Sequence, residues 1–126
     1  MPKNKNRPVF LDLTRIHQPV NAVLSIAHRA TGIVLVLLIP VLVFLFDRSL
    51  ASAQGYADVV DVLRGPAARV VLFALTWVFF HHLFAGVRYL LIDAEIGVEI
   101  RRAQASAWVV FVAGAVAAVI VTVLLP

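Results

Sequence analysis

Long apolar stretches dominate the chain, and polar residues gather between them. The apolar segments cover residues 22–46, 70–92 and 103–125. Each segment is long enough to cross about 30 Å of hydrocarbon as a helix, in which the backbone polar groups satisfy one another. Pro40 lies inside the first segment, and we expect it to bend that helix because proline removes one backbone hydrogen bond. The pattern predicts an all-α fold, an integral membrane bundle of three transmembrane helices that forms a single domain over residues 1–126.

The composition excludes a soluble enzyme. Of the 126 residues, 62% are hydrophobic and 14% are charged, whereas soluble domains have roughly 45–50% and about 25%. A domain this small could not bury so much apolar surface. The absence of cysteine excludes disulfides and the ligation of an iron–sulfur cluster by this chain. The net charge of +4 comes without a basic run interleaved with aromatic residues, so it indicates contact with lipid headgroups and no nucleic-acid partner.

The two connections between the apolar segments are short and polar. Residues 47–69 contain several serines and the Gly65-Pro66 pair, a composition typical of a loop with a short surface helix. Residues 93–102 form a charged hairpin around Gly97. The order of elements therefore predicts three antiparallel spans with little structure outside the membrane.

The distribution of basic residues predicts the orientation. With three crossings, the N-terminal region and the second connection lie on one side of the membrane, and the first connection lies on the other. The first side carries eight Lys and Arg residues and the second side carries three. Because basic residues accumulate on the cytoplasmic side, we expect a cytoplasmic N-terminus and an external C-terminus. Residues 1–21 lack the apolar core of a secretory signal, and we expect a multi-pass protein of the bacterial inner (plasma) membrane.

Several polar residues interrupt the first two apolar segments, where ionisable groups are expensive and often functional. They are Ser25, His28 and Arg29 in the first segment and His81, His82 and Arg88 in the second. In the predicted topology both groups approach the cytoplasmic end. His82 lies six residues before Arg88, about 9 Å deeper, and we expect it to lie well below His28. A neutral imidazole at that depth can ligate haem iron, and cationic side chains nearer the surface can hold the propionates. Gly86, one turn from His82, would let a flat macrocycle approach the backbone.

Each of these residues also has a structural interpretation. A membrane-embedded histidine can hydrogen-bond a neighbouring helix, and Arg29 and Arg88 can extend to the lipid interface. Helical periodicity does not choose between His81 and His82, since Arg88 lies seven residues from His81 and falls nearly on its face. The residues alone therefore leave both histidines as candidate iron ligands.

Three stretches of the chain resemble the motifs of one family. They are Arg7–Leu13 (RPVFLDL), Ser25–Gly32 (SIAHRATG) and His82–Asp93 (HLFAGVRYLLID). In order and spacing they are similar to the RPxxLDL, SIxHRxTG and HxxxGxRHxxxD motifs of the cytochrome b membrane-anchor subunit of succinate dehydrogenase, respiratory complex II. One departure is Tyr89, which stands where many relatives have a second histidine.

The resemblance implies a redox subunit that performs no chemistry on succinate itself. Such a subunit, beside a second small membrane-anchor subunit, holds a flavoprotein and an iron–sulfur subunit at the membrane. One haem b lies between the two anchor subunits, with His82 as the axial ligand from this chain. His28 and Arg29 would lie near a propionate, with Arg88 as a supporting polar residue. Ser25 and Arg29 match the positions that bind the quinone, which receives electrons from succinate through the flavin and the iron–sulfur clusters.

Other functions remain to be weighed against this one. The same anchor could serve a quinol:fumarate reductase, or it could be a purely structural anchor without haem. The presence of both His82 and the Ser25–Arg29 pair argues against a haem-free anchor. A small transporter usually has paired helical repeats or a discontinuous helix at the midplane, and the sequence has neither. We therefore expect a haem-bearing, quinone-binding subunit of succinate:quinone oxidoreductase.

Overall fold

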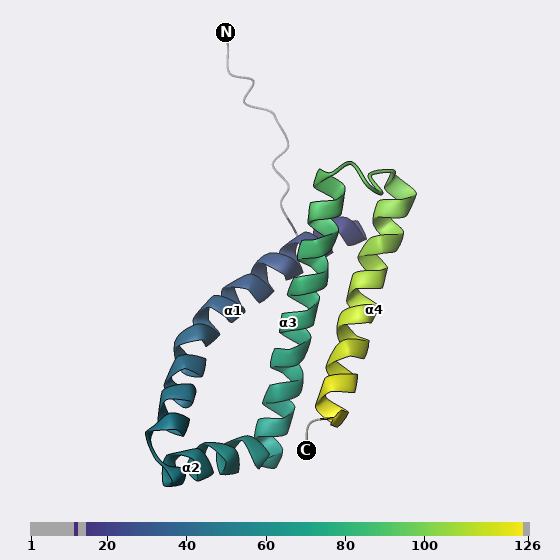
Figure 1. Cartoon of the computed structure of the whole chain (residues 1–126). Helices are drawn as coiled ribbons and strands as arrows, with labels where there is room; N and C mark the ends of the chain where they lie inside the picture. The colour runs from purple at the N-terminus through teal and green to yellow at the C-terminus, as the bar shows by residue number, and fades with distance from the viewer. Residues whose placement is uncertain (1–11, 13–14, 125–126) are drawn as a thin grey trace.

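The computed structural model describes Asp12 and residues 15–124, and the regular structure in that part of the chain is helical (Figure 1). The helices are α1 (Val20–Ala51), α2 (Ala53–Arg64), α3 (Pro66–Asp93) and α4 (Ile100–Leu124). Three of them, α1, α3 and α4, are long and apolar enough to cross a membrane. The expected all-α fold with three spans is therefore confirmed.

The helices extend beyond the apolar segments from which they were predicted. Helix α1 runs to Ala51 instead of residue 46, and α4, the third span, begins at Ile100 instead of residue 103. The predicted end of the last segment, Leu125, lies outside the described residues, as does most of the first motif. Helices can continue into the interface because polar flanking side chains such as Arg48 and Arg102 remain in contact with water and headgroups. Hydropathy therefore marks the membrane-embedded part of each helix and not its ends.

The short helix α2 lies across one end of the bundle and joins α1 to α3 (Figure 1). Its first turn is capped by Ser52, whose hydroxyl accepts a hydrogen bond from the Gly55 amide at 3.0 Å. The next helix begins with Pro66 at its first position, where a missing amide hydrogen has no consequence. This is the surface helix predicted within the first connection.

The first span, α1, is bowed, and it approaches α3 and α4 most closely near its beginning (Figure 1). The helix continues through Pro40, although the proline ring removes one backbone hydrogen bond from the span. In contrast, α3 and α4 run side by side along most of their length. Their contact uses one face of α4, formed by Ala103, Ala107, Val110, Gly114 and Ala118. Small residues on that face let the two backbones approach closely.

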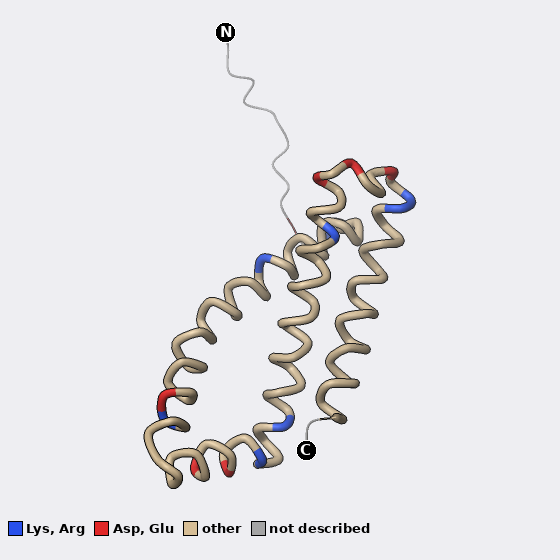
Figure 2. The backbone as a smooth tube through the Cα atoms, in the orientation of Figure 1, with Lys and Arg blue, Asp and Glu red and all other residues tan. Residues whose placement is uncertain are grey.

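Charged residues gather toward the two ends of the bundle and leave an uncharged middle (Figure 2). At the end near α2, Asp58 accepts hydrogen bonds from Gln54 at 2.9 Å and from Arg48 at 3.1 Å. These bonds, that of Gln54 above all, hold the pKa of Asp58 below its usual range. At the other end the α3–α4 hairpin turns through Glu95 and Gly97, which have φ angles of 63° and 77°. The predicted hairpin is confirmed, while the side of the membrane on which it lies stays a prediction.

Candidate haem and quinone site

The rings of His28 on α1 and His82 on α3 stack face to face. Their centroids are 4.1 Å apart and their planes are 10° from parallel. The expectation that His82 lies well below His28 is therefore wrong. His28 is eight residues after the start of α1 and His82 eleven residues before the end of α3. The two rings still lie at the same depth, because α3 continues past the start of α1 (Figure 1).

Hydrogen bonds fix the His82 ring in one orientation. Its Nδ1 atom lies 3.0 Å from the carbonyl oxygen of His28 and 3.3 Å from the Thr31 hydroxyl. A carbonyl oxygen can only accept, so Nδ1 carries the hydrogen and Nε2 of the neutral ring keeps its lone pair. The Thr31 hydroxyl is itself held, 2.9 Å from the carbonyl oxygens of both Ala27 and His28. This is the arrangement of a metal-ligating histidine whose second nitrogen is bound to a backbone carbonyl.

A hollow of about 480 Å³ lies beside the His82 ring. It is lined by Arg29, Gly32, Ile33, Val36, Leu37 and His82. A Cβ atom at Gly32 would lie only 2.9 Å from Cε1 of His82, so the glycine leaves the room that the ring occupies. Apolar walls, one imidazole and one guanidinium at the edge fit a flat apolar macrocycle with anionic substituents.

Gly86 has a different place from the one expected. A Cβ atom there would lie 3.7 Å from Nε2 of His28, so this glycine belongs to the contact between α1 and α3. The Nε2 atom of His28 is buried and has no hydrogen-bond partner among the described residues. The ring of Tyr89 lies 5.2 Å from the His28 ring on the same contact. Gly32, one turn after His28, is the glycine that lies against the His82 ring.

Ser25 and Arg29, predicted to share a face of the first helix, are in contact. The Nη2 group of Arg29 donates to the Ser25 hydroxyl at 3.1 Å, and its Nε group donates to the Ser25 carbonyl oxygen at 3.3 Å. The Arg29 side chain is exposed, and it also lines the hollow beside His82. The Arg29 guanidinium therefore lies at both the predicted quinone site and the predicted haem site.

Arg88 lies elsewhere, in the contact between α3 and α4, and is only 7% exposed. Its Nε group donates to the Ser106 hydroxyl at 2.9 Å. Its Nη2 group donates to Asn21 Oδ1 at 3.0 Å and to the Ala103 carbonyl oxygen at 2.8 Å. Sequence reasoning missed Asn21 as a partner, although an amide side chain at the start of an apolar segment is an identifiable signal.

His81 faces away from the hollow. It is fully buried between the rings of Trp77 and Phe111, at centroid distances of 5.1 Å and 5.0 Å. Neither ring nitrogen has a hydrogen-bond partner among the described residues. The α4 backbone is close, since a Cβ atom at Gly114 would lie 3.2 Å from the His81 Cα atom. The two adjacent histidines thus point to different helices.

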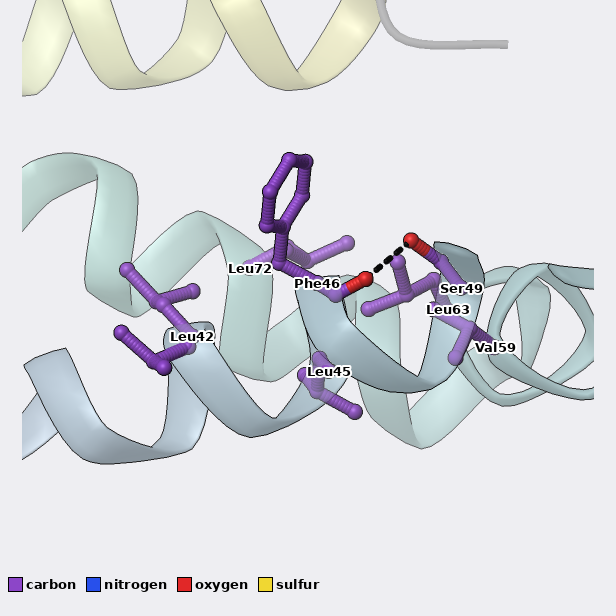
Figure 3. Close-up of a pocket in the computed structure, with 8 residues that line it drawn as sticks. Leu42, Leu45, Phe46, Ser49, Val59, Leu63 and Leu72 are labelled. Carbon is purple, nitrogen blue, oxygen red and sulfur yellow. Dashed lines mark hydrogen bonds between the residues drawn. The ribbon is translucent and has the colours of Figure 1, made fainter. Parts of the chain in front are cut away.

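A second hollow, of about 580 Å³, lies at the opposite end of the bundle, under α2 (Figure 3). It is lined by Leu42, Val43, Leu45, Phe46, Ser49, Val59, Leu63 and Leu72. Its one hydroxyl, that of Ser49, donates to the Phe46 carbonyl oxygen at 2.7 Å. This lining offers no free polar group for chemistry, unlike that of the hollow beside His82.

Comparison with known proteins identifies the family. Residues 3–122 match the family of succinate dehydrogenase/fumarate reductase transmembrane subunits. The chain is 39% identical over 119 residues to the succinate dehydrogenase cytochrome b556 subunit of Coxiella burnetii, covering 93% of this chain and 94% of the relative. It is 31% identical to the cytochrome b556 subunit of Paracoccus denitrificans, with 94% and 91% covered, and 31% identical to the cytochrome b560 subunit of Reclinomonas americana, with 84% and 77% covered.

The helical membrane fold and these matches show that the chain belongs to the family of succinate dehydrogenase/fumarate reductase transmembrane subunits. Within that family it is a cytochrome b membrane anchor of succinate dehydrogenase, and the resemblance seen in its motifs is confirmed. As a subunit it belongs to an oxidoreductase complex. The expected location, as a multi-pass protein of the bacterial inner membrane, agrees with its three spans and its bacterial relatives.

Proposed function

We propose that this subunit binds one haem b, shared with a second small membrane-anchor subunit, and helps form the quinone-reduction site of succinate:quinone oxidoreductase. The observation that carries the proposal is the His82 ring, which has its Nδ1–H bonded to the His28 carbonyl and stands at the wall of the hollow lined by Gly32 and Arg29. The alternative of a fumarate reductase anchor is not favoured, because the relatives described above are subunits of succinate dehydrogenase.

In this proposal His82 is the axial ligand to the haem iron from this chain. Bound haem b would supply reversible one-electron transfer. The His28 carbonyl fixes the tautomer and the direction of the His82 ring. Arg29, at the edge of the hollow, supplies positive charge for a propionate, and His28 lies near the same group. Arg88 keeps its place in the proposal as a supporting polar residue, with Nε and Nη2 bonded within the chain.

Ser25 and Arg29 are proposed to bind the quinone. A quinone carbonyl is a hydrogen-bond acceptor, and negative charge develops on it during reduction. A hydroxyl donor beside a permanent guanidinium charge suits both stages, and the cation helps most as the charge grows. Because Arg29 already lies 3.1 Å from the Ser25 hydroxyl, the two groups need little rearrangement to reach one carbonyl oxygen.

The proposed partners are the second anchor subunit, the iron–sulfur subunit and the flavoprotein subunit, with lipid around the bundle. Ile33, Val36 and Leu37 line the hollow beside His82 and are 63%, 64% and 67% exposed. This exposed apolar surface is suited to contact with the second anchor subunit. That subunit would supply the second ligand to the haem iron, since this chain supplies one. The iron–sulfur subunit would dock at the end where Ser25 and Arg29 stand.

The optical spectrum of the purified complex tests the haem proposal. His82→Leu should abolish or strongly alter the low-spin b-type absorbance, because the chain then lacks its iron ligand. The matched variant His81→Leu removes a neighbouring imidazole that is buried against α4, and it should retain that absorbance. Loss of the haem signal in the His81 variant with retention in the His82 variant would contradict the assignment.

A further inference from the structure

A single buried guanidinium joins all three membrane spans at the end that carries the proposed quinone site. Arg88 belongs to α3, its acceptor Asn21 lies in the first turn of α1, and its acceptors Ser106 and Ala103 belong to α4. All three bonds are between 2.8 Å and 3.0 Å long. The residue is buried, with 7% of its surface exposed. Within residues 15–124, no other side chain hydrogen-bonds to two other helices.

The position of Arg88 is unfavourable unless those bonds are made. A guanidinium stays protonated in proteins, so its charge is retained in the membrane-embedded bundle. Its three acceptors are neutral: an amide oxygen, a hydroxyl and a backbone carbonyl. The planar fork can serve three acceptors in fixed directions at once, which the single ammonium of lysine does less well. The arrangement is thus suited to holding helices in a fixed relation.

The start of α1 depends on such a contact, because it has little local support. Its N-cap residue is Pro19, which makes no side-chain cap hydrogen bond, and no acidic side chain occupies its first turn. The first-turn residue Asn21 is instead bonded to Arg88. Ser25 lies one turn further along α1, about 6 Å away, and Arg29 follows one turn later. Together with Leu24, which is fully buried in the core cluster, the contact helps to set the rotation and depth of the helical turns that carry Ser25 and Arg29.

We propose that Arg88 is a positioning residue that locks the first turn of α1, through Asn21, onto α3 and α4, and so sets the place of Ser25 and Arg29 in the quinone site. This inference rests on the proposed function of that pair. In this role Arg88 acts through the helix and does not contact the quinone. Its side chain is already committed to Asn21, Ala103 and Ser106.

Kinetics of the assembled complex test this positioning role of Arg88. Asn21→Ala and Arg88→Gln should each raise the KM for quinone about 3- to 10-fold, at unchanged succinate oxidation by an artificial acceptor that takes electrons upstream. Because the two residues act through one bond, the double variant should be no worse than Arg88→Gln alone. Arg88→Lys should restore part of the affinity. The matched control is Arg101→Gln, which removes an exposed cation from the α3–α4 end and should change the KM less than 2-fold.

Two outcomes would overturn the proposal that Arg88 is a positioning residue. One is a wild-type KM in Asn21→Ala and Arg88→Gln, with only the yield of assembled complex reduced, because this would indicate a purely structural bond. The other is fully additive effects in the double variant. The electron paramagnetic resonance signal of the haem distinguishes the positioning role of Arg88 from the quinone proposal. A movement of α1 also moves the His28 carbonyl oxygen that is hydrogen-bonded to His82. If Ser25→Ala and Arg29→Leu keep normal quinone kinetics while Asn21→Ala and Arg88→Gln shift that signal, the positioning role of Arg88 stands and the quinone assignment fails.

Discussion

The imidazole rings of His28 and His82 lie in parallel planes with their centroids 4.1 Å apart, and the carbonyl oxygen of His28 accepts the Nδ1–H of His82 at 3.0 Å. Two histidines that are 54 residues apart in the sequence are thus in direct contact. The backbone of α1 thus sets the direction of His82, the histidine that lines the hollow. Any change that shifts α1 along α3 must therefore alter the His82 ring as well.

The first prediction concerns the two glycines that flank this stack. A methyl group at Gly32 would lie 2.9 Å from Cε1 of His82, closer than non-bonded carbons approach, so Gly32→Ala must displace the ring or the helix. A methyl group at Gly86 would lie at an ordinary 3.7 Å from Nε2 of His28. We expect Gly32→Ala to change the low-spin haem spectrum, and Gly86→Ala to leave it close to that of the wild type.

Optical and electron paramagnetic resonance spectra of the purified complexes measure this difference. Both substitutions add the same single carbon to a membrane helix, so they are matched in helix propensity and volume. Equal spectra in the two variants would contradict the proposal that Gly32, and not Gly86, makes room for the His82 ring.

Much of the fold could be predicted from local pattern. Hydropathy located three spans, because only an apolar helix satisfies its backbone in lipid. The contact of Ser25 with Arg29 followed from their spacing, since residues four apart are neighbours on any α-helix. The ends of the helices were harder to predict. Helix α1 continues to Ala51 through interfacial residues, which are not apolar enough for hydropathy to assign them to the membrane.

Relations between helices could not be predicted in the same way. The equal depth of His28 and His82 depends on how far α3 extends past the start of α1, which is a property of packing and not of either segment. The partners of Arg88 lie 67, 15 and 18 residues away in the chain, on two other helices. Neither the charge pattern nor the helical periodicity predicts contacts between residues so far apart, so the partners of Arg88 in the α3–α4 contact were not predicted.

The second prediction concerns topology. Eight basic residues on the side of the N-terminus and the α3–α4 hairpin, against three on the other side, predict a cytoplasmic N-terminus. A reporter that is active only outside the cytoplasm should therefore work when it is fused after the last span or inserted at Ser52. The same reporter inserted at Gly97, in the α3–α4 hairpin, is the internal control and should be silent. Strong activity of a cytoplasmic reporter at the C-terminus would contradict the model.

The third prediction concerns the contact between α3 and α4. In Gly114→Ala the new methyl group would lie 3.2 Å and 3.3 Å from the Cα and N atoms of His81. These are backbone atoms, so the helices must separate by a few tenths of an ångström. The overlap should outweigh the gain in helix propensity and destabilise the complex by about 1 kcal/mol. Thermal unfolding followed by haem absorbance measures the loss, and Ala115→Val, on the exposed side of α4, should show none.

The last prediction concerns the quinone site. Ser25→Ala removes the hydroxyl donor, and Arg29→Leu removes both the cation and the donor that holds Ser25 at 3.1 Å. Losing a donor aimed at developing negative charge commonly slows a reaction by a factor of about 100 or more. Because Arg29 remains as a donor in Ser25→Ala, we expect succinate-to-quinone turnover to fall only about 10-fold there and about 100-fold in Arg29→Leu. Succinate oxidation by an artificial acceptor that takes electrons upstream should be unchanged, because neither side chain belongs to that part of the pathway.

The comparison of the two electron acceptors decides between a quinone site and a structural role for this pair. If both activities fall together in the Ser25 and Arg29 variants, the complex has failed to assemble, and the haem and flavin contents of the membranes will fall with them. Arg29→Lys retains the charge but not the paired N–H groups that reach Ser25, so it should recover part of the turnover lost in Arg29→Leu. Normal quinone reduction in a fully assembled Arg29→Leu complex would refute the assignment, since an exposed arginine that only meets lipid phosphates can be replaced without loss of turnover.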